Sequence, residues 1–131
     1  MKKYENFVRA VKNLHDVYSC QEPYSNIELT GLVGLFTICF EQSWKAMKEI
    51  LEKHGYSEGK MGSPRFVLQM AYQAGMIDDE ETWLQALETR NQVAHAYNES
   101  VALEIIRQTK EKFVTMFVEL QKTMEETWLL P

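Results

Sequence analysis

At 131 residues the chain is long enough for one domain with a buried core, and we expect a single domain over residues 1–131. Its net charge of -5 argues against a protein that coats nucleic acid by bulk electrostatics, although a local basic site remains compatible with it. Two cysteines, Cys20 and Cys39, are too few for a disulfide scaffold, so we expect reduced, buried thiols.

No segment predicts export or membrane insertion. The first residues lead into an amphipathic pattern rather than the apolar core of a signal peptide. The longest apolar run, residues 29–40, is far shorter than the ~20 residues that span a bilayer. We therefore expect a cytoplasmic protein without a membrane association.

The first half of the chain predicts two helices. Apolar residues recur every three or four positions over residues 3–19, and Pro23 follows the end of this pattern. A longer helix is expected over residues 26–54. Its main apolar stripe consists of Leu29, Leu32, Phe36, Phe40, Trp44, Met47 and Leu51, and we expect Trp44, like Trp83, to lie in the core.

The first half of this second helix is apolar on another face as well, and this face carries Val33, Leu35, Ile38 and Cys39. A helix that is apolar nearly all round is buried from more than one side. In a bundle this small, we expect the second side to contact another subunit. Gly31 and Gly34 would allow a neighbouring backbone to approach closely.

Three more helices are expected in the second half, with Gly55 as the C-cap that ends the second helix before them. Ser63 and Pro64 predict the start of a third helix that ends at Gly75. We expect this helix to bury Val67, Leu68, Ala71 and Tyr72. Asp78, followed by Glu81, resembles a capping box that opens a fourth helix, and the chain restarts at Asn98 as a fifth helix that reaches about Thr127.

No strand pattern competes with these helices, and the connections between them are short. Short connections favour antiparallel neighbours. The predicted fold is therefore all-α, an antiparallel up-and-down bundle of four or five helices.

The best place to look for chemistry is the segment from Arg90 to Tyr97, which also contains His95. Arginine is a permanent cation whose forked donors suit phosphate, and histidine moves protons near neutral pH. Residues five apart on an ideal α-helix are ~140° out of phase. Arg90 and His95 can therefore converge only if the helix loosens near His95, or if the partner residues come from another subunit.

Each of these residues also has a plainer interpretation. Arg90 could simply pair with a carboxylate, and His95 could cap the helix C-terminus, where a cation is favoured. Glu41 could pair with Lys45 one turn along its own helix. The sharper alternative is that Glu41 is a buried carboxylate that receives Arg90 from the fourth helix.

Other kinds of site lack support in the sequence. No His, Cys or carboxylate pair has the spacing of a zinc site, and we expect neither a metal nor a cofactor. There is no glycine-rich phosphate loop after a strand and no nucleophilic serine motif.

Three segments together resemble the nucleotidyltransferase substrate-binding family, a branch of the HEPN superfamily. They are residues 40–45 (FEQSWK), residues 62–65 (GSPR) with 74–77 (AGMI), and residues 89–99 (TRNQVAHAYNE). The resemblance covers about residues 25–120. Its most specific part is R-x4-H followed by x-Tyr.

The resemblance implies a helical bundle that forms a homodimer or a higher even oligomer. It implies a minimal nucleotidyltransferase as partner, encoded nearby, and RNA or a nucleotide as ligand. In related proteins the R-x4-6-H motif forms a metal-independent endoribonuclease across the dimer, often as the toxin of a toxin–antitoxin pair. By this resemblance Arg90 and His95 would be catalytic, Asn91 supporting, and Tyr97 the acceptor of AMP from the transferase. Glu41 is a further supporting candidate, because it is a possible partner of Arg90.

Whether the chain is an enzyme stays open at this point, because ribonuclease activity does not follow for every member of the branch. One alternative is a non-catalytic subunit that binds nucleotide or substrate for a two-component nucleotidyltransferase. Another is a purely structural helical partner in which the motif is a salt-bridged helix end.

Overall fold

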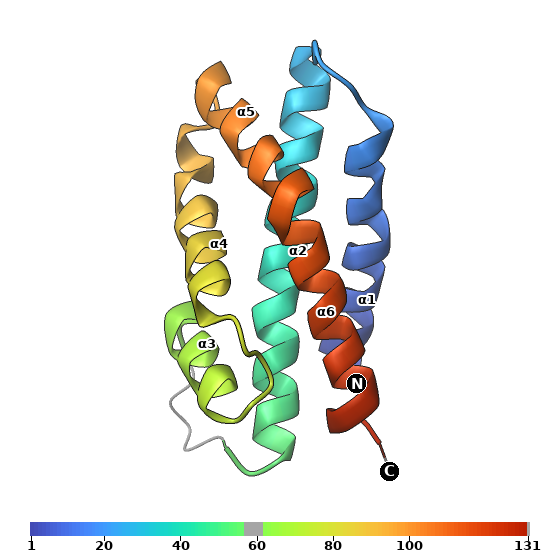
Figure 1. Cartoon of the computed structure of the whole chain (residues 1–131), viewed down its shortest axis with the longest axis vertical. Coiled ribbons are helices and arrows are strands. Elements are labelled where there is room, and N and C mark those ends of the chain that lie inside the picture. The colour runs from blue at the N-terminus through green and yellow to red at the C-terminus, as the bar shows by residue number, and fades with distance from the viewer. Residues whose placement is uncertain (57–61, 131) are drawn as a thin grey trace.

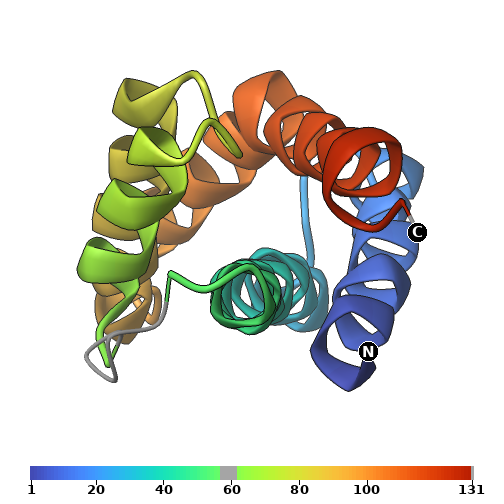
Figure 2. The same ribbon diagram turned by 90° about the horizontal axis from the view of Figure 1, so that it is seen from below.

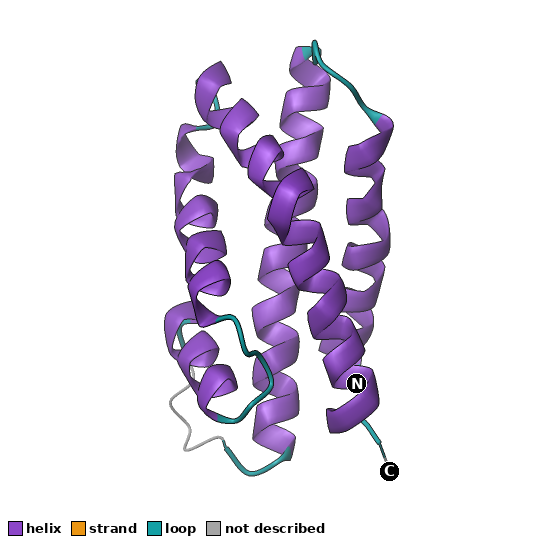
Figure 3. Ribbon diagram, viewed as in Figure 1, coloured by secondary structure: helices purple, strands orange, loops and turns teal. Residues whose placement is uncertain are grey.

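The computed structural model describes residues 1–56 and 62–130. Every regular element in these ranges is helical (Figure 3), which confirms the predicted all-α class. The elements in chain order are α1 (Lys2–Leu14), η1 (His15–Ser19), α2 (Asn26–Lys53), α3 (Pro64–Gln73), α4 (Glu80–Gln92), η2 (Val93–His95), α5 (Glu99–Gln108), η3 (Thr109–Phe113), α6 (Val114–Thr123) and η4 (Met124–Trp128).

The helices form an antiparallel up-and-down bundle (Figure 1). The chain ascends through α1, descends through α2, ascends again through α4 and descends from α5 to α6, while the short α3 lies beside the lower end of α2. Seen from below in Figure 2, α1, α5–α6 and α3–α4 form an arc around α2. Because α2 contacts the other long helices, the predicted apolar stripe along it has a partner on several sides.

The centre of the bundle is aromatic. The ring of Phe36 lies 5.3 Å from that of Phe113 and 6.4 Å from that of Phe117, measured between centroids. Trp83 of α4 lies 5.5 Å from Phe117 and 6.3 Å from Phe40, also between centroids. Residues from α2, α4, η3 and α6 therefore share one core, in which each of these five side chains is almost fully buried.

Helix ends follow local chemistry. Ser63 Oγ accepts from Phe66 N at the start of α3, and Gly55 and Gly75 adopt φ values of 86° and 83°, which only glycine adopts without strain. The predicted cap of α4 is wrong by one residue. Asp79, not Asp78, accepts from Thr82 N at 3.1 Å, because α4 begins at Glu80.

Three expectations about burial need correction. Tyr72 is 46% exposed, although the sequence pattern predicts its burial, because the side chains that α3 buries are those of Val67, Leu68 and Ala71. Trp44 is only partly buried, so it is not a full member of the core. Both cysteines are free thiols, but only Cys39 is fully buried, and this burial raises its pKa.

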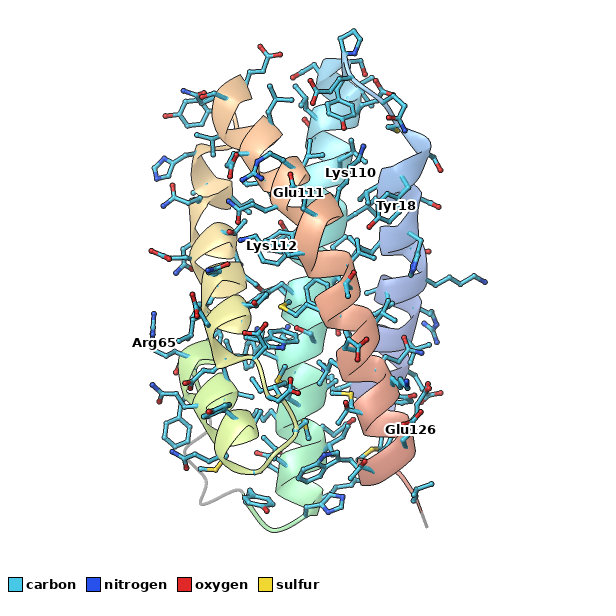
Figure 4. All side chains as sticks on the ribbon, in the orientation of Figure 1. Tyr18, Arg65, Lys110, Glu111, Lys112 and Glu126 are labelled. Atoms are coloured by element: carbon cyan, nitrogen blue, oxygen red, sulfur yellow. The ribbon has the colours of Figure 1, made fainter. Side chains whose placement is uncertain are left out.

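The last helical segment runs from Glu99 to Trp128 with two π-helical turns, η3 and η4, where the sequence predicts one regular helix. Contacts from the α1–α2 connection hold η3 in place. The Tyr18 hydroxyl donates to Lys110 O at 3.0 Å, and both residues are labelled in Figure 4. Lys110 Nζ also donates to Cys20 O and to the Tyr24 hydroxyl. No helix in the described ranges is long and apolar enough to cross a lipid bilayer.

Candidate functional site

Arg90 lies in the last turn of α4 and reaches across to the middle of α2. Its Nε donates to Glu41 Oε2 at 2.7 Å, and its Nη2 donates to Glu41 Oε1 at 3.2 Å. Two parallel N–H···O bonds of this kind fix the plane of the guanidinium group as well as its position. The side chains are 32% and 24% exposed respectively, so the pair lies at the edge of the core rather than within it.

The sharper alternative for Glu41 is therefore correct about its partner, but the carboxylate is only partly buried. Among the described residues, Glu41 forms its ion pair with Arg90, and none is formed between Glu41 and Lys45. Glu41 Oε1 also accepts from the indole Nε1 of Trp44 at 3.1 Å. The sequence interpretation of Trp44 as core missed this contact, although the i, i+3 spacing of the two residues on α2 could have indicated it.

Asn91 contributes to the same cluster. Its Oδ1 accepts from Arg90 Nη1 at 3.2 Å. A guanidinium group has five N–H donors. Glu41 takes two of them and Asn91 takes one, which leaves two N–H groups of Arg90 without a partner in the described part of the chain. These two are available to an anion.

α4 ends just before His95, near the position where the spacing of the motif suggests that the helix loosens. α4 stops at Gln92, and residues Val93–His95 form a 3-10 turn closed by a bond from Ala96 N to Val93 O at 3.0 Å. Asn98 N then bonds to His95 O, and Asn98 Oδ1 caps α5 through Ser100 N at 2.9 Å. The prediction that the helix loosens near His95 is confirmed.

His95 and Tyr97 lie at this turn, and neither forms a hydrogen bond with the Arg90–Glu41 pair. His95 is exposed, and its ring makes no hydrogen bond to any described residue, so it does not cap a carbonyl of α4. The Tyr97 side chain is 89% exposed. One chain thus brings together Arg90, Glu41 and Asn91, but it does not join His95 to them by any bond.

A groove of about 610 Å³ separates the turn from the first half of α2. Its walls include Leu29, Val33, Gly34 and Ile38 on α2, and Val93 and Tyr97 on the turn. No basic residue is among the described residues that line it. Ile38 is 56% exposed, although the sequence pattern places it on an apolar face.

The glycines of α2 border the same face. A Cβ atom built on Gly31 or Gly34 would meet no atom within 4 Å. The packing of this chain therefore does not require glycine at either position. No cluster of three or more metal-ligating side chains occurs within residues 1–56 and 62–130.

The chain matches the sequence profile of a known family. The profile described as "Nucleotidyltransferase substrate binding protein like" matches residues 2–126. A protein of Haemophilus influenzae named "Probable ribonuclease HepT" is 27% identical over 82 residues, which are 61% of this chain and 56% of that protein.

A solved structure has the same fold. A crystal structure of a protein from Thermus thermophilus superimposes with a TM-score of 0.72 at 24% sequence identity, and the match covers 95% of this chain and 99% of that one. The family profile spans nearly the whole chain, including the Arg90–Tyr97 segment and its Glu41 partner. The chain therefore belongs to the nucleotidyltransferase substrate-binding protein-like family.

Proposed function

We propose that this chain is the helical partner of a minimal nucleotidyltransferase, and that its homodimer is a metal-independent endoribonuclease acting as the toxin of a toxin–antitoxin pair. The observation that carries the proposal is the hydrogen bonding of Arg90. Glu41 holds it in a fixed orientation while two of its N–H groups stay available, and an exposed His95 follows on a turn five residues later.

This set of side chains suits RNA cleavage by the 2′-hydroxyl. The 2′-oxygen attacks phosphorus and the bond from phosphorus to the 5′-oxygen breaks, giving a 2′,3′-cyclic phosphate and a free 5′-hydroxyl. One imidazole accepts the 2′ proton and a second donates a proton to the leaving oxygen. Arg90 neutralises the charge that develops on the phosphate oxygens. Two copies of His95 would supply both imidazoles.

The proposal therefore needs a second copy, and the exposed face of α2 supports one. Glycine inside a helix costs about 1 kcal/mol relative to alanine, and the interior of this chain gives no reason for Gly31 and Gly34. Close approach of another backbone would explain both. The exposed Ile38 and the α2 wall of the apolar groove would be covered by the same contact.

The relative named a probable ribonuclease supports the reaction class, and the family description supports the transferase as partner. The exposed Tyr97 hydroxyl is the proposed acceptor of AMP. An attached nucleotide would add negative charge and bulk two residues from His95.

The test is RNA cleavage by the purified protein, without added metal and with a chelator present. We expect wild-type protein to cut cellular RNA and His95→Ala to be inactive while it keeps its helical content. His15→Ala is the matched control, because His15 is also exposed but lies at the end of α1. Absence of cleavage by an intact wild-type oligomer would refute the ribonuclease.

A non-catalytic nucleotide-binding subunit is the second candidate. It is favoured by the two free N–H groups of Arg90, which can hold a phosphate without any proton transfer by His95. Calorimetry with nucleotides separates the two candidates. Nucleotide binding that requires Arg90, in a protein that cleaves no RNA, supports this second function.

A further inference from the structure

We propose that Trp44 is a positioning residue for Arg90: its indole N–H orients the Glu41 carboxylate, which in turn aims the two free N–H groups of Arg90 at the phosphate. This inference rests on the proposed ribonuclease function and adds to it a residue from outside the Arg90–Tyr97 segment.

The three side chains form one continuous chain of hydrogen bonds. Trp44 Nε1 donates to Glu41 Oε1 at 3.1 Å, and the same oxygen accepts from Arg90 Nη2 at 3.2 Å. Glu41 Oε2 accepts from Arg90 Nε at 2.7 Å. The carboxylate is thus held by a donor from its own helix on one side and by the arginine from α4 on the other.

The indole matters because Glu41 has few other restraints. Its side chain is 24% exposed, and in the described ranges its oxygens bond only to Trp44 and Arg90. A flexible carboxylate can rotate about its side-chain torsions, and a rotated carboxylate would accept from Arg90 at a different angle. Since the arginine fork is planar and rigid, any rotation of its partner redirects its free edge.

Trp44 is suited to this task because it is itself fixed. It packs against the core while remaining partly exposed. The indole nitrogen is a donor only, so it can satisfy a carboxylate but cannot compete with it for Arg90. A large apolar body with one polar edge therefore holds the donor in place at the margin of the core.

Trp44→Phe tests the proposal because it keeps an aromatic ring and removes the N–H. We expect the single-turnover cleavage rate at saturating RNA to fall roughly three- to tenfold, the effect of one lost hydrogen bond. The concentration of RNA that gives half-maximal rate should stay unchanged, since the variant keeps the charge of Arg90. A thermal melting curve of each variant is the control that it stays folded at the assay temperature.

Trp128→Phe is the matched control. Trp128 Nε1 has no hydrogen-bond partner among the described residues, and its ring packs on His54, which caps the C-terminus of α2. This variant makes the same chemical change away from the Arg90 site. We expect it to cleave RNA at the wild-type rate.

A second pair of variants shows whether Trp44 acts through Glu41. In a Glu41→Ala background the indole has no carboxylate to orient, so adding Trp44→Phe should lower the rate no further. An equal loss in both backgrounds would refute the proposed route through Glu41. An unchanged rate for Trp44→Phe would refute the positioning role while leaving the ribonuclease intact, whereas an inactive wild-type protein would refute the ribonuclease itself.

Discussion

Arg90 and Glu41 are 49 residues apart in the sequence, and Arg90 Nε donates to Glu41 Oε2 at 2.7 Å. The contact joins the last turn of α4 to the middle of α2. It lies just before the point where α4 gives way to the turn that carries His95. The pair thus fixes the position of Arg90 relative to the core before the chain leaves the helix.

Glu41→Gln should show how much the Arg90–Glu41 pair contributes to RNA cleavage and how much to stability. The amide keeps the volume but loses the negative charge and one acceptor, so Arg90 loses its fork partner. We expect RNA cleavage to fall at least about tenfold, while the free energy of unfolding falls by about 1 kcal/mol or less, because both side chains are partly exposed. Cleavage rates and urea unfolding measure the two effects.

Glu111→Gln is the control for Glu41→Gln, because it disrupts the exposed ion pair between Glu111 of η3 and Arg107 of α5. It should leave cleavage unchanged. Wild-type cleavage by Glu41→Gln would show that the orientation of Arg90 by a carboxylate has no part in the reaction.

Tyr97→Phe should cleave RNA normally and resist silencing. The proposed modification needs the phenolic oxygen, which is freely accessible on a side chain that is 89% exposed. Incubation with the partner transferase and ATP should add the mass of AMP to wild-type protein and stop cleavage, but should do neither to Tyr97→Phe. Tyr72→Phe, which alters another exposed tyrosine on α3, should behave as wild type.

Ile38→Glu should dissociate the oligomer without unfolding the bundle. A charge on the proposed contact face would have to be desolvated in the dimer, whereas the 56% exposure of Ile38 in one chain leaves the monomer able to hydrate it. Sedimentation should show a monomer with an unchanged circular dichroism spectrum. Val118→Glu changes an exposed apolar residue on α6 and should remain oligomeric. A dimer of Ile38→Glu as stable as wild type would place the interface elsewhere.

Asp79→Ala should destabilise the protein by about 1 kcal/mol through loss of the α4 N-cap. The Thr82 hydroxyl and then the Thr82 N–H lower the pKa of Asp79 by bonding to its charged form. This stabilisation is therefore complete above the unfolded pKa of about 3.9 and is lost as the pH falls through the lower folded pKa. Urea unfolding at pH 7 and at pH 2.5 should show a larger difference from wild type in the free energy of unfolding at the higher pH.

Asp78→Ala is the neighbouring control for Asp79→Ala. The sequence pattern favours Asp78 as the cap, but in the structure it makes no capping bond to α4. We expect the free energy of unfolding to change by no more than about 0.5 kcal/mol at both pH values, as is typical of an exposed position. A loss at Asp78 equal to that at Asp79 would contradict the observed start of α4.

The local sequence determined most helix boundaries of this protein. The apolar spacing over residues 26–54 predicts α2 within one residue of its end, and Ser63, Gly55 and Gly75 mark helix boundaries, because a cap depends on residues only a few positions away. The ~140° offset between Arg90 and His95 on an ideal helix left two routes to convergence, a break near His95 or residues from another subunit, and α4 does end in a 3-10 turn there.

Only the tertiary structure decided which side chains meet. The sequence left Glu41 with two possible partners, because its i+4 neighbour and a residue of another helix are equally compatible with the spacing along one helix. The choice of Arg90 depends on how α4 packs across α2, and the partly exposed position of Trp44 depends on the same packing. Contacts between helices are set by the rotation of each helix about its axis, and no local pattern fixes that rotation.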